Sequence, residues 1–310
     1  MSRRRWIGIA AGIVAVCGVL AAIAAHVPGA AQFISQEVEE FSDKLDVPFV
    51  ASHESVLDTM FDLAKVTKDD FIVDLGSGDG RIVITAVKKF GARGFGVDLN
   101  EQLVAMSNEW AQEEGIADRA KFYVRDLFQT DFSQATVLTM YLLPHVVLKL
   151  RPKLLSTLAP GTRIVSHDYD LGAWQPDESR EVERDWISRS VVHFWVVPAD
   201  VGGTWTWTTP QASESADDAQ VTARIAQRFQ VVRGKVKVNE RSRAMRNVRL
   251  RGRSFRFTFP GDGEGAPKAV YEGTVAGDTI TGTVRYFDGD REVAKPWRAA
   301  RQSGGGQLAR

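Results

Sequence analysis

The sequence predicts an α/β fold with a largely parallel sheet, followed by a small antiparallel β module. Two observations support the parallel sheet: short apolar runs alternate with helical segments between residues 54 and 167, and a glycine-rich turn follows the first of these runs. A third observation supports the module, because the helical period disappears beyond Gly202 and short strand-like segments replace it.

The composition is that of a globular protein with a sizeable core. Of 310 residues, 44% are hydrophobic and 25% are charged, and 39 basic side chains balance 39 acidic ones. A formal net charge of zero excludes a global field that attracts nucleic acid or acidic substrates, so we expect no nucleic-acid partner. The single cysteine, Cys17, excludes an internal disulfide, and no cluster has the spacing of a metal site, so we expect no metal.

The N-terminus has the pattern of a membrane anchor. Arg3, Arg4 and Arg5 precede a charge-free apolar run from Trp6 to Ala25, which is about long enough to span a bilayer. A cleaved signal peptide with a processing site near Gly29–Ala31 is the alternative, although the run is longer than a usual signal core. We therefore divide the chain into an anchor (1–31), a catalytic domain (32–201) and a β-rich module with a flexible tail (202–310).

The expected elements of the catalytic domain follow in order. An amphipathic linker at 32–45 precedes a helix over about 56–64, capped by Ser52 or Ser55. Strands are then expected at 71–75, 93–99, 121–127, 136–141 and 163–167, helices at 81–90, 101–114 and 144–159, and an antiparallel edge strand at 186–197.

In the module we expect strands at 229–238, 254–259, 269–276 and 279–287, with Gly277 and Asp278 forming a hairpin turn. Trp205 and Trp207, two residues apart, are expected on one face of a strand, in the module core or at an interface. The arginine-rich stretch 224–256 could bind anionic lipid or nucleic acid, but solvated strand faces are the commoner explanation. Residues 302–310 look like a frayed tail.

The segment that carries chemistry lies where a strand turns into a helix. It reads Val73-Asp74-Leu75-Gly76-Ser77-Gly78-Asp79-Gly80-Arg81. A dinucleotide site has the spacing GxGxxG, whereas DxGxGxG bends the backbone beneath a ligand that has no pyrophosphate. Two more acidic residues end later strands: Asp98 can accept hydrogen bonds from ribose hydroxyls, and Asp126 follows the third strand.

This pattern resembles the class I methyltransferases that use S-adenosylmethionine. The resemblance implies a Rossmann-like, seven-stranded, mostly parallel sheet with helices on both faces, and S-adenosyl-L-methionine as cofactor. In that family the third acidic position approaches the adenine amine. The implied cofactor-binding residues are Asp74, Gly76, Ser77, Gly78, Gly80, Asp98, Leu99, Asp126 and Leu127.

A closer resemblance covers about residues 47–177. Val47-Pro48-Phe49-Val50, Tyr141-Leu142-Leu143-Pro144, Leu150-Arg151-Pro152-Lys153-Leu154 and Ser166-His167-Asp168 are similar to the mitochondrial-type lysine methyltransferases that act on the ATP synthase c-ring protein or on the adenine nucleotide translocase. The resemblance implies methylation of protein lysines. Two features differ from that family: Ala51-Ser52-His53 stands where a proline and threonine are usual, and the module after Gly202 is additional.

Three side chains are candidates for the catalytic site. Methyl transfer needs the nucleophile aligned with the methyl group and unprotonated. Tyr141, after the fourth strand, could orient an amine, although a half-buried packing role is equally common for such a tyrosine. His167 and Asp168, after the fifth strand, are placed to shape the pocket.

Three functions remain open at this point: methylation of lysine in a membrane-associated protein, methylation of a small molecule or lipid, and a non-catalytic envelope-binding protein. Orientation is open as well. Three arginines before the apolar run favour a body outside the membrane, whereas the cofactor is made inside the cell. We expect a membrane-anchored protein whose catalytic domain faces the cytosol.

Overall fold

A computed structural model describes residues 50–183, 189–209, 219–238, 240–259, 268–288 and 291–304. The expected anchor (1–31), the linker at 32–45 and residues 184–188 lie outside this range. In the part that is described, no helix is long and apolar enough to cross a membrane.

The first sheet has seven strands in the order β3-β2-β1-β4-β5-β7-β6. The pairs from β3 to β5 are parallel, and β7 pairs antiparallel with both β5 and β6. This is the expected methyltransferase-like α/β architecture. The strands are β1 (Phe71–Leu75), β2 (Arg93–Asp98), β3 (Ala120–Val124), β4 (Val137–Met140), β5 (Arg163–His167), β6 (Glu178–Glu183) and β7 (Arg189–Val196).

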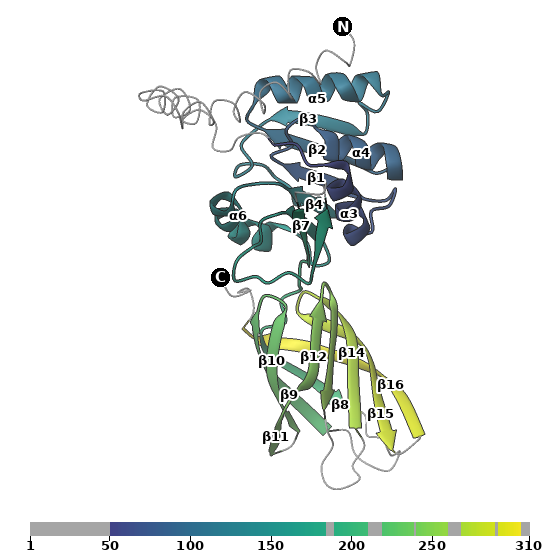
Figure 1. Ribbon diagram of the computed structural model, residues 1–310. Helices are drawn as coiled ribbons and strands as arrows, with labels where there is room; N and C mark the ends of the chain where they lie inside the picture. The colour runs from purple at the N-terminus through teal and green to yellow at the C-terminus, as the bar shows by residue number, and fades with distance from the viewer. Residues whose placement is uncertain are drawn as a thin grey trace. The chain divides into compact units, whose positions relative to one another are not determined.

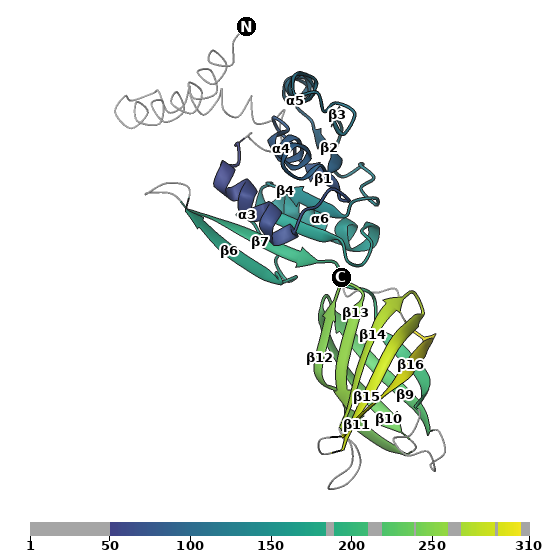
Figure 2. The ribbon, with the colours of Figure 1, turned by 90° about the vertical axis from the view of Figure 1, so that its right-hand side faces the viewer.

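Helices pack on both faces of this sheet. On one face lie α3 (Glu54–Ala64), α4 (Arg81–Phe90) and α5 (Glu101–Glu113), and α6 (Pro144–Thr157) lies on the other (Figures 1 and 2). Strands β1, β4 and β5 are buried along almost their whole length, because a parallel sheet covered on both faces leaves neither side to solvent. All parallel strands therefore end at one edge of the sheet, beneath the loops that carry the expected site.

Two expectations for this domain were wrong. The expected edge strand at 186–197 is β7, which lies inside the sheet, and the true edge is β6. Because β6 reads Glu-Ser-Arg-Glu-Val-Glu with only Val182 buried, its charges concealed it in the sequence. Neither Ser52 nor Ser55 caps α3; the cap is His53, whose ring accepts a bond from the Ser55 amide.

The second sheet is antiparallel throughout, with nine strands in the order β11-β10-β9-β8-β16-β15-β14-β13-β12. Figures 1 and 2 show it curling around its own core, and its ends approach each other where the Met245 amide donates to the Gly234 carbonyl. The strands are β8 (Gly203–Thr209), β9 (Ala219–Arg228), β10 (Val231–Val238), β11 (Arg241–Ala244), β12 (Arg246–Arg251), β13 (Ser254–Phe259), β14 (Lys268–Ala276), β15 (Thr279–Asp288) and β16 (Arg291–Ser303).

The module core is aromatic. Trp205 and Trp207, expected on one face of a strand, are both buried in it together with Phe257, Tyr271 and Trp297. The hairpin turn at Gly277 and Asp278 is confirmed by the pairing of Ala276 with Thr279. The expected tail was partly wrong, because residues 302 and 303 belong to β16; residues 305–310 lie outside the described range.

Candidate functional site

The glycine-rich loop between β1 and α4 forms the centre of the site. Gly76, Gly78 and Gly80 all have positive φ angles, of 75°, 52° and 79°, a conformation that side chains with a Cβ rarely adopt. The amides of Gly76 and Ser77 both donate to the Val97 carbonyl at 2.9 Å, which holds the loop against the end of β2. The backbone therefore turns sharply and keeps its place.

Steric contacts explain why two of these positions need glycine. A Cβ on Gly76 would lie 2.6 Å from Leu142 Cδ2, and a Cβ on Gly80 would lie 2.7 Å from the Phe122 ring and 2.8 Å from Ser107. The loop thus lies directly on the neighbouring strands and helix, and a ligand can approach its backbone closely.

Asp98, at the end of β2, is fixed by backbone amides. Its Oδ2 accepts a hydrogen bond from the Gly78 amide at 2.8 Å, and its Oδ1 accepts one from the Asn100 amide at 2.9 Å. Its carboxylate is half-buried at the carboxyl edge of the sheet, so lone pairs remain available to a ligand's hydroxyl groups. This is the position and chemistry expected of a ribose acceptor.

Asp74 and Ser77 leave buried polar atoms for a ligand. Oδ1 of Asp74 accepts a hydrogen bond from the Thr139 hydroxyl at 2.7 Å, whereas Oδ2 of Asp74 and the Ser77 hydroxyl have no partner among the described residues. Burial raises the pKa of Asp74 to about 7, and the nearby charges of Asp98 and Asp79 raise it further against the effect of the Thr139 bond. Buried polar groups are normally satisfied, so these atoms fit a polar cofactor.

The third acidic position lies on the adjacent loop. Oδ1 of Asp126 accepts from the Phe128 amide at 2.7 Å, and Oδ2 accepts from the Gln129 side chain at 3.2 Å. Leu127 is half-buried, while Leu99 exposes 49% of its surface although it follows a buried strand. An exposed leucine between two ordered acids offers an apolar contact for a ring such as adenine.

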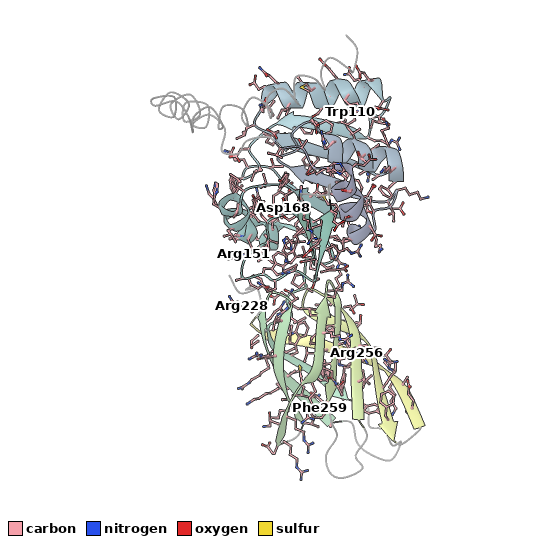
Figure 3. The ribbon with its side chains drawn as sticks, viewed as in Figure 1. Trp110, Arg151, Asp168, Arg228, Arg256 and Phe259 are labelled. Carbon is pink, nitrogen blue, oxygen red and sulfur yellow. The ribbon has the colours of Figure 1, made fainter. Side chains whose placement is uncertain are left out.

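Tyr141, His167 and Asp168, the three catalytic candidates, form one cluster. The Tyr141 ring stacks on His167 with centroids 3.8 Å apart, and its hydroxyl lies 3.4 Å from Oδ2 of Asp168. Asp168 (Figure 3) has a φ of 63°, which is unusual for a side chain other than glycine, and its Oδ1 accepts from the Val191 amide at 2.9 Å. Tyr169 also stacks with Tyr141, with ring centroids 6.4 Å apart.

Within this cluster His167 is fully buried, so it cannot touch an acceptor directly. Its two ring nitrogens each lie 2.9 Å from a serine hydroxyl, Nδ1 from Ser52 and Nε2 from Ser190. The ring is therefore held at both ends while Tyr141 stacks on it. The geometry gives His167 a positioning role, and leaves Tyr141 and Asp168, both partly exposed, to meet a substrate.

Sequence reasoning missed the residues that connect the two halves of the site. Arg81 forms a close ion pair with Asp79, 2.6 Å at the nearest atoms, and its other amino group donates to the Ser52 carbonyl at 2.9 Å. Ser52 therefore touches both the glycine-rich loop and, through its hydroxyl, His167. The only sequence signal was the serine itself, which we assigned to a helix cap.

The described residues contain no group of three His, Cys, Asp or Glu side chains that could hold a metal ion. What they do contain is a strained loop of glycines, an ordered acid beside it, and two orphaned buried polar atoms. These features fit a cofactor with a ribose, a polar amino-acid part and a flat ring, as S-adenosylmethionine has.

Comparisons with known proteins agree with this geometry. Residues 74–178 match the profile of the ANTKMT methyltransferase domain. A protein-lysine N-methyltransferase of Saccharolobus islandicus is 40% identical over 152 residues, which cover 49% of this chain and 94% of that protein. The human lysine N-methyltransferase of the ATP synthase c-ring protein is 35% identical over 134 residues, covering 43% of this chain and only 57% of the human enzyme.

A solved structure is also similar in sequence. It is an RNA methyltransferase from Salinibacter ruber in complex with S-adenosyl-L-homocysteine, 47% identical, with a TM-score of 0.44 over 47% of this chain and 93% of that one. Together the loop geometry, the family profile and the Saccharolobus relative lead to one assignment: the chain belongs to the ANTKMT-type family of S-adenosylmethionine-dependent methyltransferases, whose named relatives methylate protein lysines.

Proposed function

We propose that this protein methylates the side-chain nitrogen of a lysine in a membrane-associated protein. The observation that carries the proposal is the pairing of Tyr141 with Asp168 at the same sheet edge as the cofactor loop. A lysine side chain carries a positive charge in water, and a carboxylate beside aromatic faces attracts a cation. Tyr141 and Tyr169 supply those faces, and Asp168 supplies the carboxylate.

The residues of this cluster would prepare the lysine for attack. When bound, S-adenosylmethionine supplies a methyl group on a positively charged sulfur. The lysine nitrogen must lose its proton, attack the methyl carbon with its lone pair, and break the carbon–sulfur bond in line. Asp168 would accept the departing proton and pass it to solvent, since its side chain is partly exposed. Tyr141, held by stacking on His167, would aim the nitrogen.

The positive φ of Asp168 supports this role. Folding holds the residue in a strained backbone conformation, which the Val191 amide and carbonyl stabilise with bonds of 2.9 and 2.7 Å. The strain turns the carboxylate toward Tyr141 rather than along the chain. Strained side chains of this kind are concentrated at functional sites, although strain alone does not define the reaction.

The choice of a membrane-associated acceptor rests on two observations. The relatives include a human enzyme named for the ATP synthase c-ring protein and a mouse enzyme named for the adenine nucleotide translocase. This chain also begins with an apolar run from Trp6 to Ala25, which would bring the catalytic domain to a membrane. We further propose that the domain faces the cytosol, where the cofactor is available; a compartment-sensitive reporter after Arg310 would test it.

The decisive experiment uses the full chain with cofactor labelled in its methyl group. Membranes of the source cell are incubated with wild type, Tyr141→Phe or Asp168→Asn, and the labelled products are hydrolysed. We expect methyllysine, a loss of kcat of about tenfold to a thousandfold in both variants, and unchanged cofactor affinity. Asp170→Asn, two residues away and exposed, is the matched control and should remain active.

Other labelled products would reject parts of the proposal. Label in extractable lipid or small molecules would favour the alternative acceptors considered from the sequence. A folded protein that binds no cofactor would favour a binding role. Full activity of Asp168→Asn would show that the proton leaves by another path.

A further inference from the structure

The β module has a face whose cations are not balanced by acids. Between residues 219 and 258 the sequence holds twelve lysines and arginines and one acid, Glu240, although the whole chain is neutral. The outward positions of β9, β10 and β12 carry most of them. We name as the cationic face the exposed side chains Arg224, Arg228, Arg233, Lys235, Arg246 and Arg249, none of which has an ion-pair partner among the described residues.

Strand pairing makes this face continuous. Arg224 on β9 lies directly opposite Lys235 on β10. The Met245 amide, next to Arg246, donates to the carbonyl of Gly234, next to Lys235, so β12 begins beside β10. On the far side of β12, Arg249 lies opposite Arg256. The labels of Arg228 and Arg256 in Figure 3 mark two places along this surface.

The rest of the module shows that unpaired cations are not its general habit. On β13 to β16, Glu272 lies 2.8 Å from Arg256 and 2.6 Å from Arg285, and Arg285 is 3.9 Å from Glu292. Positive and negative charges thus alternate from strand to strand there. Like charges directly opposite each other, as at Arg224 and Lys235, destabilise a sheet, so the stability of the fold does not explain the cationic face.

We propose that the cationic face binds the anionic lipid surface of a membrane. This is independent of the methyltransferase activity and of the N-terminal apolar run. Basic residues near a negatively charged leaflet are attracted without any shaped pocket, as a row of side chains on a flat sheet requires. Val231 lies in the same outward row of β10 and exposes 58% of its surface, so it can enter the interface between the lipid headgroups.

The side chains present favour lipid over nucleic acid. Single-stranded nucleic acid is held by exposed aromatic rings on which bases stack, but Phe229, Phe255 and Phe257 are all buried here. Duplex readout needs an element that enters a groove, and this face consists of the outer surface of a curled sheet. A planar array of negative headgroups therefore matches it better.

The test asks whether the cationic face itself touches lipid. In the full chain carrying Cys17→Ser, a Val231→Cys variant is labelled with a fluorophore and mixed with vesicles that contain lipid bearing a headgroup quencher. We compare 30 mol% phosphatidylglycerol with pure phosphatidylcholine. This readout works whether or not the N-terminus inserts, because it reports contact at β10. A label at Met106→Cys, on α5, reports contact elsewhere.

We expect quenching at residue 231 only with phosphatidylglycerol, and less of it as salt rises. Neutralising Arg224, Arg233, Lys235 and Arg246 to glutamine should lower the equilibrium constant for contact by about a hundredfold, given about fivefold per cation. The matched control neutralises four other positions, Lys68, Arg119, Lys121 and Arg298, which are also exposed and give the same net charge. It should retain the contact.

Three results would overturn the proposal. They are equal quenching on pure phosphatidylcholine, equal loss in the matched control, and tight binding of an RNA oligonucleotide without any lipid contact at residue 231. Unchanged cofactor affinity and an unchanged thermal transition will show that the neutralised variant is folded.

Discussion

The two sheets of this protein use charge in opposite ways. In the seven-stranded sheet the acids converge at one edge: Asp74, Asp98, Asp126 and Asp168 all stand where strands end, and backbone amides hold three of them. In the nine-stranded sheet the aromatic side chains point inward and the cations point outward along whole strands. A parallel sheet gathers chemistry at a point, because all its strands end together. An antiparallel sheet spreads it over a surface.

The comparison also extends to buried polar atoms without partners. Asp74 Oδ2 and Ser77 Oγ occur at the site, where a cofactor can satisfy them, whereas the indole nitrogens of Trp207 and Trp297 occur in the module core. The same shortfall thus has two meanings. Beside a strained glycine loop it indicates a ligand position, and inside an aromatic core it is a cost of packing large side chains.

The largest effect is expected at Asp98. Asp98→Ala removes a carboxylate that would accept two ribose hydrogen bonds and that also holds the Gly78 amide. We expect calorimetric affinity for S-adenosylmethionine to fall at least about a hundredfold, because hydrogen bonds to a charged group are the strong ones. Asp118→Ala, an exposed acid on a nearby loop, serves as control. Similar affinities for both variants would separate the acid from the cofactor.

The next effect is a pH dependence from Asp74. Its folded pKa is about 7 against 3.8 in the unfolded chain, so the folded state binds the proton more tightly. That contribution to stability is complete below pH 3.8 and is lost as pH rises toward 7. Relative to Asp74→Asn, the wild type should lose up to about 4 kcal/mol between pH 4 and 8 in urea unfolding. A constant difference across that range would mean that Asp74 is ionised in the fold.

The smallest effect compares two tryptophans of the module core. Trp205 donates to the Val201 carbonyl at 2.9 Å and has Arg301 4.5 Å from its ring, whereas the Trp207 nitrogen has no partner among the described residues. Both lose similar volume on mutation to phenylalanine. We expect Trp205→Phe to cost about 1–2 kcal/mol more than Trp207→Phe in chemical unfolding. Equal costs would show that volume alone decides stability there.

Much of the cofactor site was readable from the sequence. The strand from Phe71, the glycine turn and the helix from Arg81 are encoded within about ten residues, so local rules of backbone conformation suffice. Asp98 and Asp126 could be placed because the carboxyl ends of neighbouring parallel strands meet. The helix caps and the edge strand could not, since His53 and β6 depend on what packs beside them.

The sequence by itself therefore determined the parallel fold, the cofactor and the acids that line the loop. Only the tertiary structure decided how Ser52 and Ser190 hold His167, how Tyr141 meets Asp168, and how Gly234 and Met245 bring the cations of β10 and β12 together. The reason is physical. A glycine turn is fixed by its own backbone angles, whereas a contact between residues more than a hundred positions apart, such as Ser52 and His167, exists only after both sheet faces have packed.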